Sequence, residues 1–120
     1  MIIENKTPYP DAEVAKIVRS AAAASPHGPK PQLVVVRYRT LPADTRLGFT
    51  PYDHRYPMEL WVEPPDRYPQ PGARSWREEL TLSTLHEMNH YRHKDCHGQR
   101  CEAAAENYAQ KERRRLRAWR

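Results

Sequence analysis

Residues 86–90 read His-Glu-Met-Asn-His, and this spacing is suited to binding a metal ion. In an α-helix, residues i and i+4 lie one above the other, so His86 and His90 would share a face. Two imidazoles placed in this way can bind one Zn²⁺ ion, while Glu87 between them points toward a water bound to that ion. The ion would lower the pKa of the water, and Glu87 could accept its proton as the water attacks a carbonyl group. The segment therefore predicts a hydrolytic zinc centre, against the simpler alternative of a polar helix face carrying hydrogen-bonded histidines.

A third protein ligand is needed, because a catalytic zinc ion usually takes three and leaves a fourth position for water. We favour Glu102, at the start of the last predicted helix, because that helix could fold back across the turn at Gly98. Glu106 lies one helical turn further on the same face, where it could accept a hydrogen bond from a ligating histidine. His97, in the loop before this helix, and Glu106 itself stay open as alternative ligands. An ordinary solvated helix face is the simpler explanation for the two glutamates.

Two cysteines, Cys96 and Cys101, lie between these motifs, with His93 and His97 close by in the sequence. A Cys-x4-Cys pair with interleaved histidines could hold a structural zinc ion, but this spacing does not match the common zinc-finger types. We favour a transient disulfide or two free thiols. Two cysteines do not make a disulfide framework. The predicted cofactor is therefore a single catalytic zinc ion.

The elements that must position these residues follow from hydrophobic periodicity and from the helix-breaking residues. Ser75 and Glu78 form the pattern of a capping box, which starts a helix shortly before the zinc motif. Asp11 is placed to cap an earlier helix. We expect helices at residues 11–24, 75–92 and 101–119, and strands at residues 32–39, 46–50 and 58–63. The strand at 58–63 is bounded by prolines, which suits the edge of a sheet. The order predicts an α+β domain: an N-terminal helix, a small mixed or antiparallel sheet, then two helices.

The length of 120 residues allows one core, so we assign residues 1–120 to a single domain. The N-terminus lacks the apolar run of a signal peptide, and no stretch approaches the roughly 18 apolar residues of a membrane span. We therefore expect a soluble, cytoplasmic protein without membrane contact. The net charge is +5, and a basic helical tail at about residues 111–120 suggests a weak contact with nucleic acid or an acidic partner. A solvated helix end is the simpler interpretation of this tail.

The zinc motif and the last helix resemble those of the gluzincin metallopeptidases, a group within the zincins. In that group, HExxH on an active-site helix is followed by a glutamate helix with the pattern Glu-x-x-x-Asp/Glu, and Glu102 and Glu106 match its two acids. The residues Ala105, Tyr108 and Ala109 add a similarity to the glutamate helix of ImmA/IrrE-type metallopeptidases. The small size and the element order resemble the minigluzincins. The resemblance covers about residues 75–110.

This resemblance implies a zincin-like fold and a metallopeptidase that cleaves a peptide bond in a protein or peptide. It implies that His86, His90 and Glu102 hold the zinc ion and that Glu106 supports a ligating histidine. In zincins, an edge strand above the cleft binds the extended substrate by strand addition. The strand at 58–63 is the candidate here, through Met58, Leu60 and Val62.

A second resemblance and two different functions stay open. The loop at residues 93–98 is similar to that of SprT-like proteins, in which a histidine followed by glycine is the third ligand. In that case His97 would replace Glu102, and the basic tail would suggest proteolysis of DNA-associated proteins. The two different functions are a non-catalytic zinc-binding module and a nucleic-acid-binding module in which the zinc motif is incidental.

Overall fold

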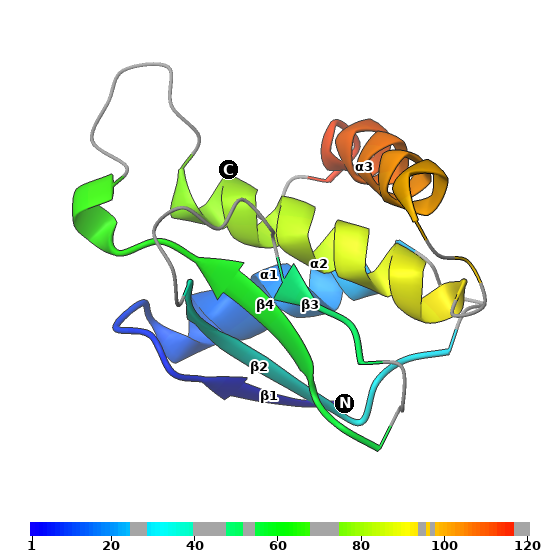
Figure 1. The fold of residues 1–120 in the computed structure, drawn as a ribbon. Helices are drawn as coiled ribbons and strands as arrows, with labels where there is room; N and C mark the ends of the chain where they lie inside the picture. Colours follow the sequence, from blue (N-terminus) through cyan, green and yellow to red (C-terminus); the bar gives the residue numbers. More distant parts are fainter. Residues whose placement is uncertain are drawn as a thin grey trace.

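Four strands pair into one sheet in the computed structural model, which describes residues 1–24, 29–39, 48–51, 55–67, 75–93, 96 and 98–116 (Figure 1). The strands are β1 (Ile2–Asn5), β2 (Leu33–Tyr38), β3 (Gly48–Phe49) and β4 (Met58–Val62), in the spatial order β1-β2-β4-β3. β1 and β4 run parallel to β2, whereas β3 runs antiparallel to β4. The sheet is therefore mixed, and the predicted α+β class is confirmed.

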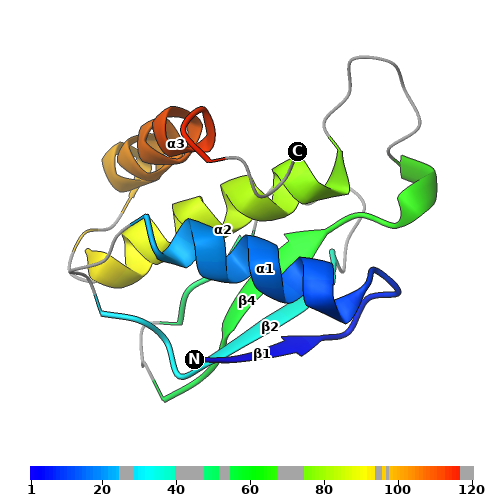
Figure 2. The ribbon, with the colours of Figure 1, turned by 180° about the vertical axis from the view of Figure 1, so that it is seen from behind.

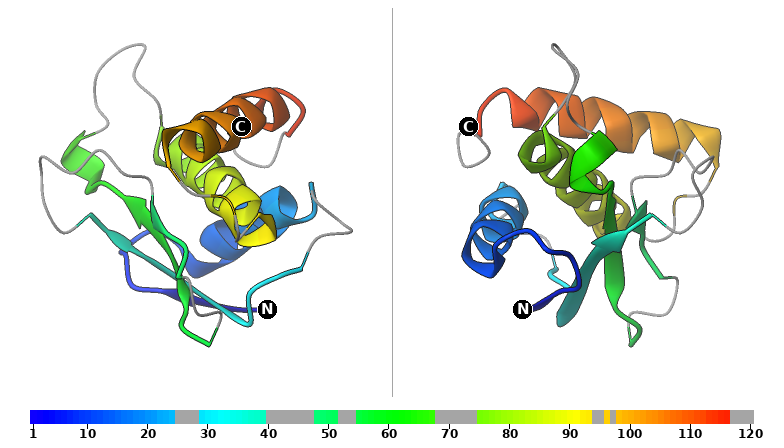
Figure 3. Two further views of the ribbon diagram at one scale, coloured as in Figure 1. Left: turned by 45° about the vertical axis from the view of Figure 1, so that its right-hand side comes forward. Right: turned by 90° about the vertical axis from the view of Figure 1, so that its left-hand side faces the viewer.

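Three helices complete the fold: α1 (Asp11–Ala22), α2 (Trp76–Arg92) and α3 (Gln99–Arg113). A short 3-10 turn, Pro65–Arg67, follows β4. α1 and α2 lie side by side on one face of the sheet, and α3 packs on α2 on the side away from the sheet (Figures 2 and 3). None of the helices within the described ranges is long and apolar enough to cross a membrane.

Two apolar clusters hold these layers together. The larger lies between the sheet and the helices α1 and α2, and includes Leu60 of β4 and Leu80 of α2, both fully buried. In the smaller one, Leu82 and Leu85 of α2 pack with Ala109 of α3. Burial of each leucine stabilises the fold by roughly 1.5–3 kcal/mol. Because α2 contributes to both clusters, the helix that carries the zinc motif is fixed in the middle of the molecule.

The prediction that residues 58–63 form an edge strand is wrong. β4 lies between β2 and β3: it pairs with β2 along its whole length and with β3 at Glu59 and Leu60. Met58, Leu60 and Val62 are each fully buried and belong to the larger core cluster, so they do not form a peptide-binding edge. Pro57 and Pro64 misled the prediction because they lie just outside the strand, where a missing N–H group does not interrupt the ladder.

The N-terminal region differs from the expectation in two respects. The sequence pattern does not predict β1, whose four residues are held by pairing with the distant residues of β2, a contact that has no local signature. α1 begins at Asp11, but Pro10 is the N-cap and no side chain caps the helix. The Asp11 carboxylate instead accepts a hydrogen bond from Asn5 Nδ2 at 2.8 Å, which joins the start of α1 to the end of β1.

The two C-terminal helices agree more closely with the sequence. Ser75 caps α2 as predicted, since its side chain accepts a hydrogen bond from the Glu78 amide at 3.1 Å. α3 is shorter than the expected range of 101–119 and begins two residues earlier. Gly98 precedes it with a φ of 89°, a left-handed conformation that favours glycine and lets the chain reverse between α2 and α3. The end of the expected basic tail, residues 117–120, lies outside the described residues.

Candidate metal centre

His86 and His90 of α2 point in the same direction, as the spacing of one helical turn requires. Their Nε2 atoms lie 3.1 Å apart, and the two rings meet edge to face with centroids 4.8 Å apart. The two side chains are only 9% and 17% exposed. Packing of α2 on its neighbours therefore restricts both imidazoles, which is the condition for a preorganised ligand pair.

Glu102 reaches the same point from the first turn of α3. Its Oε2 lies 3.0 Å from His86 Nε2, and its Oε1 lies 2.9 Å from His90 Nε2. One donor atom from each of the three residues falls within 4.8 Å of the others, a grouping that could hold a metal ion. The structure thus brings together the three residues that the sequence predicts as ligands.

The separations within this group are close to those that a tetrahedral zinc ion requires. Zinc–nitrogen and zinc–carboxylate distances of about 2.0–2.2 Å place neighbouring donors of a tetrahedron roughly 3.3 Å apart. The two Nε2 atoms lie 3.1 Å apart, and each lies 2.9 to 3.0 Å from a different oxygen of the Glu102 carboxylate. The donor set of two imidazoles and one carboxylate also suits zinc chemically.

Glu106 lies behind His86, on the side away from the three donors. Its Oε2 is 3.3 Å from His86 Nδ1, and its Oε1 accepts a hydrogen bond from Gln110 Nε2 at 2.8 Å. A carboxylate at Nδ1 favours the tautomer that carries its proton there, which leaves the Nε2 lone pair free to bind a metal. The contact has the geometry expected from the sequence for a supporting residue.

The electrostatic environment of His90 favours the neutral ring. Burial lowers the pKa of His90, and the neighbouring His86 acts in the same direction, whereas the Glu102 carboxylate opposes both. A metal ion binds the deprotonated imidazole nitrogen. The net lowering therefore keeps His90 in the form that can act as a ligand.

Glu87 is buried, but its carboxylate lies toward β3 and is not one of the three grouped donors. The Thr50 Oγ1 atom, one residue after β3, lies 2.5 Å from Glu87 Oε2 and 3.1 Å from the backbone oxygen of Glu87. Sequence reasoning did not single out Thr50. A single threonine after a two-residue strand carries no motif, so only the folded chain shows this contact.

Three features attach α3 to α2. Ala105 and Ala109 are fully buried and allow close approach, the Arg113 guanidinium pairs with Glu78 in the first turn of α2, and Arg92 lies over the Tyr108 ring at 5.3 Å. At the other end, Cys96 and Cys101 form a disulfide across the loop between the helices. This disulfide is one of the two states that the sequence favours for the cysteines, and it offers no thiolate to a second zinc ion.

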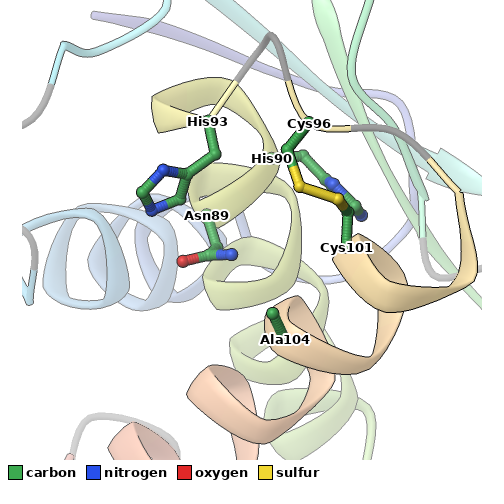
Figure 4. A pocket seen from close by; sticks show the side chains of 6 residues that line it. All are labelled: Asn89, His90, His93, Cys96, Cys101 and Ala104. Atoms are coloured by element: carbon green, nitrogen blue, oxygen red, sulfur yellow. A yellow bond between two sulfur atoms is a disulfide. The ribbon is translucent and has the colours of Figure 1, made fainter.

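A cavity of about 240 Å³ adjoins this disulfide, between the end of α2 and the start of α3 (Figure 4). Its lining consists of side chains from both helices and from the loop: Asn89, His90, His93, Cys96, Cys101 and Ala104. His90 is the only member of the three-donor group among them. The cavity therefore borders the candidate metal centre without containing it.

The remaining predicted residues lie elsewhere or are not described. His97, the alternative ligand, lies outside the described residues. Met58, Leu60 and Val62 are fully buried in the core. Within the described part of the basic tail, Lys111, Arg114 and Arg115 are exposed.

Comparisons with protein-family models, with curated proteins and with solved structures found no match for this chain. The functional conclusion is therefore based on the residue pattern and on the geometry of the candidate metal centre.

Proposed function

We propose that this chain is a zinc-dependent metallopeptidase of the zincin type, similar to the gluzincins. His86, His90 and Glu102 would hold the ion, and Glu87 would be the general base. The observation that carries the proposal is the position of Glu102 on a separate helix: its Oε2 lies 3.0 Å from His86 Nε2, and its Oε1 lies 2.9 Å from His90 Nε2. Three suitable donors meet in this way only because α3 folds back on α2.

The chemistry follows from the positions of these side chains. A zinc ion held by them would acidify a water and polarise the substrate carbonyl group. Glu87 would accept a proton from the attacking water at a carboxylate oxygen and deliver it to the leaving amine nitrogen. Glu106 would keep the proton of His86 on Nδ1 through its 3.3 Å contact, so that Nε2 stays a lone-pair donor.

The choice of a peptide bond as the substrate comes from the resemblance to gluzincins and from the order of elements. A sheet followed by the HExxH helix and then by a helix that supplies the third ligand agrees with that group. The SprT-like alternative needs His97 in place of Glu102, and the close approach of Glu102 to both histidines favours the gluzincin-like arrangement. A non-catalytic zinc-binding module would not need a base, so the buried Glu87 supports an enzyme.

The main competing explanation is that the same contacts form a metal-free network. Hydrogen bonds from His86 and His90 to Glu102 would then serve only to attach α3 to α2, and the basic tail would carry any nucleic-acid contact. Zinc content separates the two. A metallopeptidase should retain about one zinc ion per chain after purification without chelator, whereas a metal-free network should retain almost none.

The Glu87→Gln variant tests the catalytic half of the proposal. It should keep the zinc content and the melting temperature of the wild type, because Glu87 is outside the donor group, and should lose hydrolysis of unfolded casein and of a mixed peptide library. Glu4→Gln, an exposed change on β1, is the matched control and should be fully active. Loss of zinc from Glu87→Gln would show that Glu87 is a ligand and that its assignment as a base is wrong.

A further inference from the structure

We propose that Thr50 is a positioning residue that keeps Glu87 from becoming a fourth zinc ligand. The inference rests on the proposed function and concerns the same site. It starts from the contact between the Thr50 hydroxyl and Glu87 Oε2 at 2.5 Å. A buried carboxylate needs hydrogen-bond donors in place of water, so this hydroxyl stabilises one particular orientation of the Glu87 side chain.

The backbone of β3 places Thr50 where it can make this contact. β3 pairs with β4 in the register Gly48↔Leu60 and Phe49↔Glu59. Side chains alternate along an extended segment, so Gly48 and Thr50 face α2, while Phe49 faces the opposite side and is 45% exposed. Thr50 therefore reaches the HExxH helix through strand pairing, although it lies 37 residues from Glu87 in the sequence.

Gly48 permits the close approach of β3 to Glu87. A Cβ atom at this position would lie 2.3 Å from the backbone oxygen of Glu59 and 3.0 Å from Glu87 Cγ. Any larger residue would clash first with the backbone of β4 and would also press on the Glu87 side chain. Gly48 therefore leaves no room for a side chain between β3, β4 and Glu87, and the hydroxyl of Thr50 contacts the Glu87 carboxylate directly.

The consequence concerns the fourth position of a catalytic zinc ion. Such a site must leave that position open, yet Glu87 is adjacent in sequence to the ligand His86, and carboxylates bind zinc well. Glu87 also has a carboxylate that could bind zinc. The residues whose donor atoms lie close to one another are, however, His86, His90 and Glu102. The hydroxyl of Thr50 would hold the Glu87 carboxylate in its contact with the end of β3, so that Glu87 does not take the fourth position from water.

The test compares Thr50→Val, which keeps the shape and removes the hydroxyl, with Thr50→Ser, which keeps the hydroxyl. Each protein is loaded with Co²⁺ in place of zinc, because the visible absorption of cobalt reports the number and type of its ligands. We expect Thr50→Val to change the cobalt spectrum, and Thr50→Ser to reproduce that of the wild type. The double variant Thr50→Val/Glu87→Gln should return to the wild-type spectrum, since the amide is a poor ligand.

Zinc affinity and hydrolysis give a second readout. Thr50→Val should bind zinc at least as tightly as the wild type, because it gains a ligand, while hydrolysis of the peptide library falls about 10–100-fold in kcat with KM unchanged. A purely structural role for Thr50 would instead weaken zinc binding and leave the cobalt spectrum unchanged, which would overturn the inference. If Thr50→Val does not fold, Thr50→Ala gives the same comparison with less bulk. Failure of the wild type to bind Co²⁺ or Zn²⁺ would overturn the proposed function itself.

Discussion

The two halves of the candidate metal centre are built in different ways. The half on α2 is buried: the His86 side chain is 9% exposed, and the helix packs on the sheet on one side and on α3 on the other. The half on α3 is open, since the Glu102 and Glu106 side chains are 63% and 42% exposed. α3 buries only Cys101, Ala105 and Ala109 within its span.

This difference separates two proposed ligands on a buried helix from one that depends on docking of α3. His86 and His90 belong to a helix that contributes to both apolar clusters. Glu102 is held by the attachment of a thinly buried helix, so metal binding and the docking of α3 should stabilise each other. Variants in the α2 half should remove the site, whereas variants in the α3 half should weaken it less the farther they lie from the donors.

The largest effect is expected from His86→Ala and His90→Ala together. We expect the wild type to bind zinc stoichiometrically and to gain melting temperature from it, and the double variant to lose both, because ligand binding energy is also folding energy. His93→Ala is the matched control, since His93 is exposed at the end of α2 and outside the donor group. Zinc analysis and thermal unfolding with and without chelator measure both effects. One tightly held zinc ion in the double variant would refute the site.

The next largest effect on zinc affinity distinguishes the candidate third ligands. Glu102→Ala should weaken zinc binding by orders of magnitude, because only two strong protein ligands would remain. Glu106→Ala should weaken it about 10–100-fold through lost orientation of His86, and His97→Ala should change it little. Chelator competition at one pH gives the three dissociation constants. If His97→Ala is the most damaging, the gluzincin-like assignment is wrong and the SprT-like alternative replaces it.

The same comparison explains which features the sequence could predict. The Ser75 cap and the spacing of His86 and His90 are local, so the helix and its ligand pair follow from a short window of residues. The role of Glu102 could also be predicted, because Gly98 indicates that the chain reverses direction before the last helix. Glu102 and Glu106 are one helical turn apart and so share a face. Nothing local places β4 inside the sheet or Thr50 against Glu87, since both depend on pairing between distant strands.

A smaller effect on zinc affinity is expected from removal of the disulfide between Cys96 and Cys101, at the start of α3. Replacing Cys96 and Cys101 by serine opens a loop whose cysteines are five positions apart, which corresponds to about 2 kcal/mol of stability in the chain-entropy description. Zinc affinity should fall by less than about tenfold, because the disulfide restrains the backbone before Glu102 and is not a ligand. Serine variants are preferable to reduced protein, whose free thiols would bind zinc themselves. A loss as large as that of Glu102→Ala would mean that the loop, and not the helix packing, positions the third ligand.

The smallest effect on zinc is expected at the far end of α3, where Arg113 pairs with Glu78 of α2. Their side chains are 24% and 14% exposed, so Arg113→Met should remove a partly buried interaction and lower the free energy of unfolding of the metal-free protein by about 1–2 kcal/mol. Arg115→Met is the control: Arg115 is 71% exposed and 3.5 Å from Glu112, and its loss should cost less than about 0.5 kcal/mol. Urea unfolding in the presence of chelator measures stability, and chelator competition measures zinc affinity.

Because Arg113 is three helical turns from Glu102, zinc affinity should change by no more than a few-fold. If Arg113→Met weakens zinc as much as Glu106→Ala does, α3 docks as one rigid unit, and the attachment of its far end contributes as much to the third ligand as the contacts around His86.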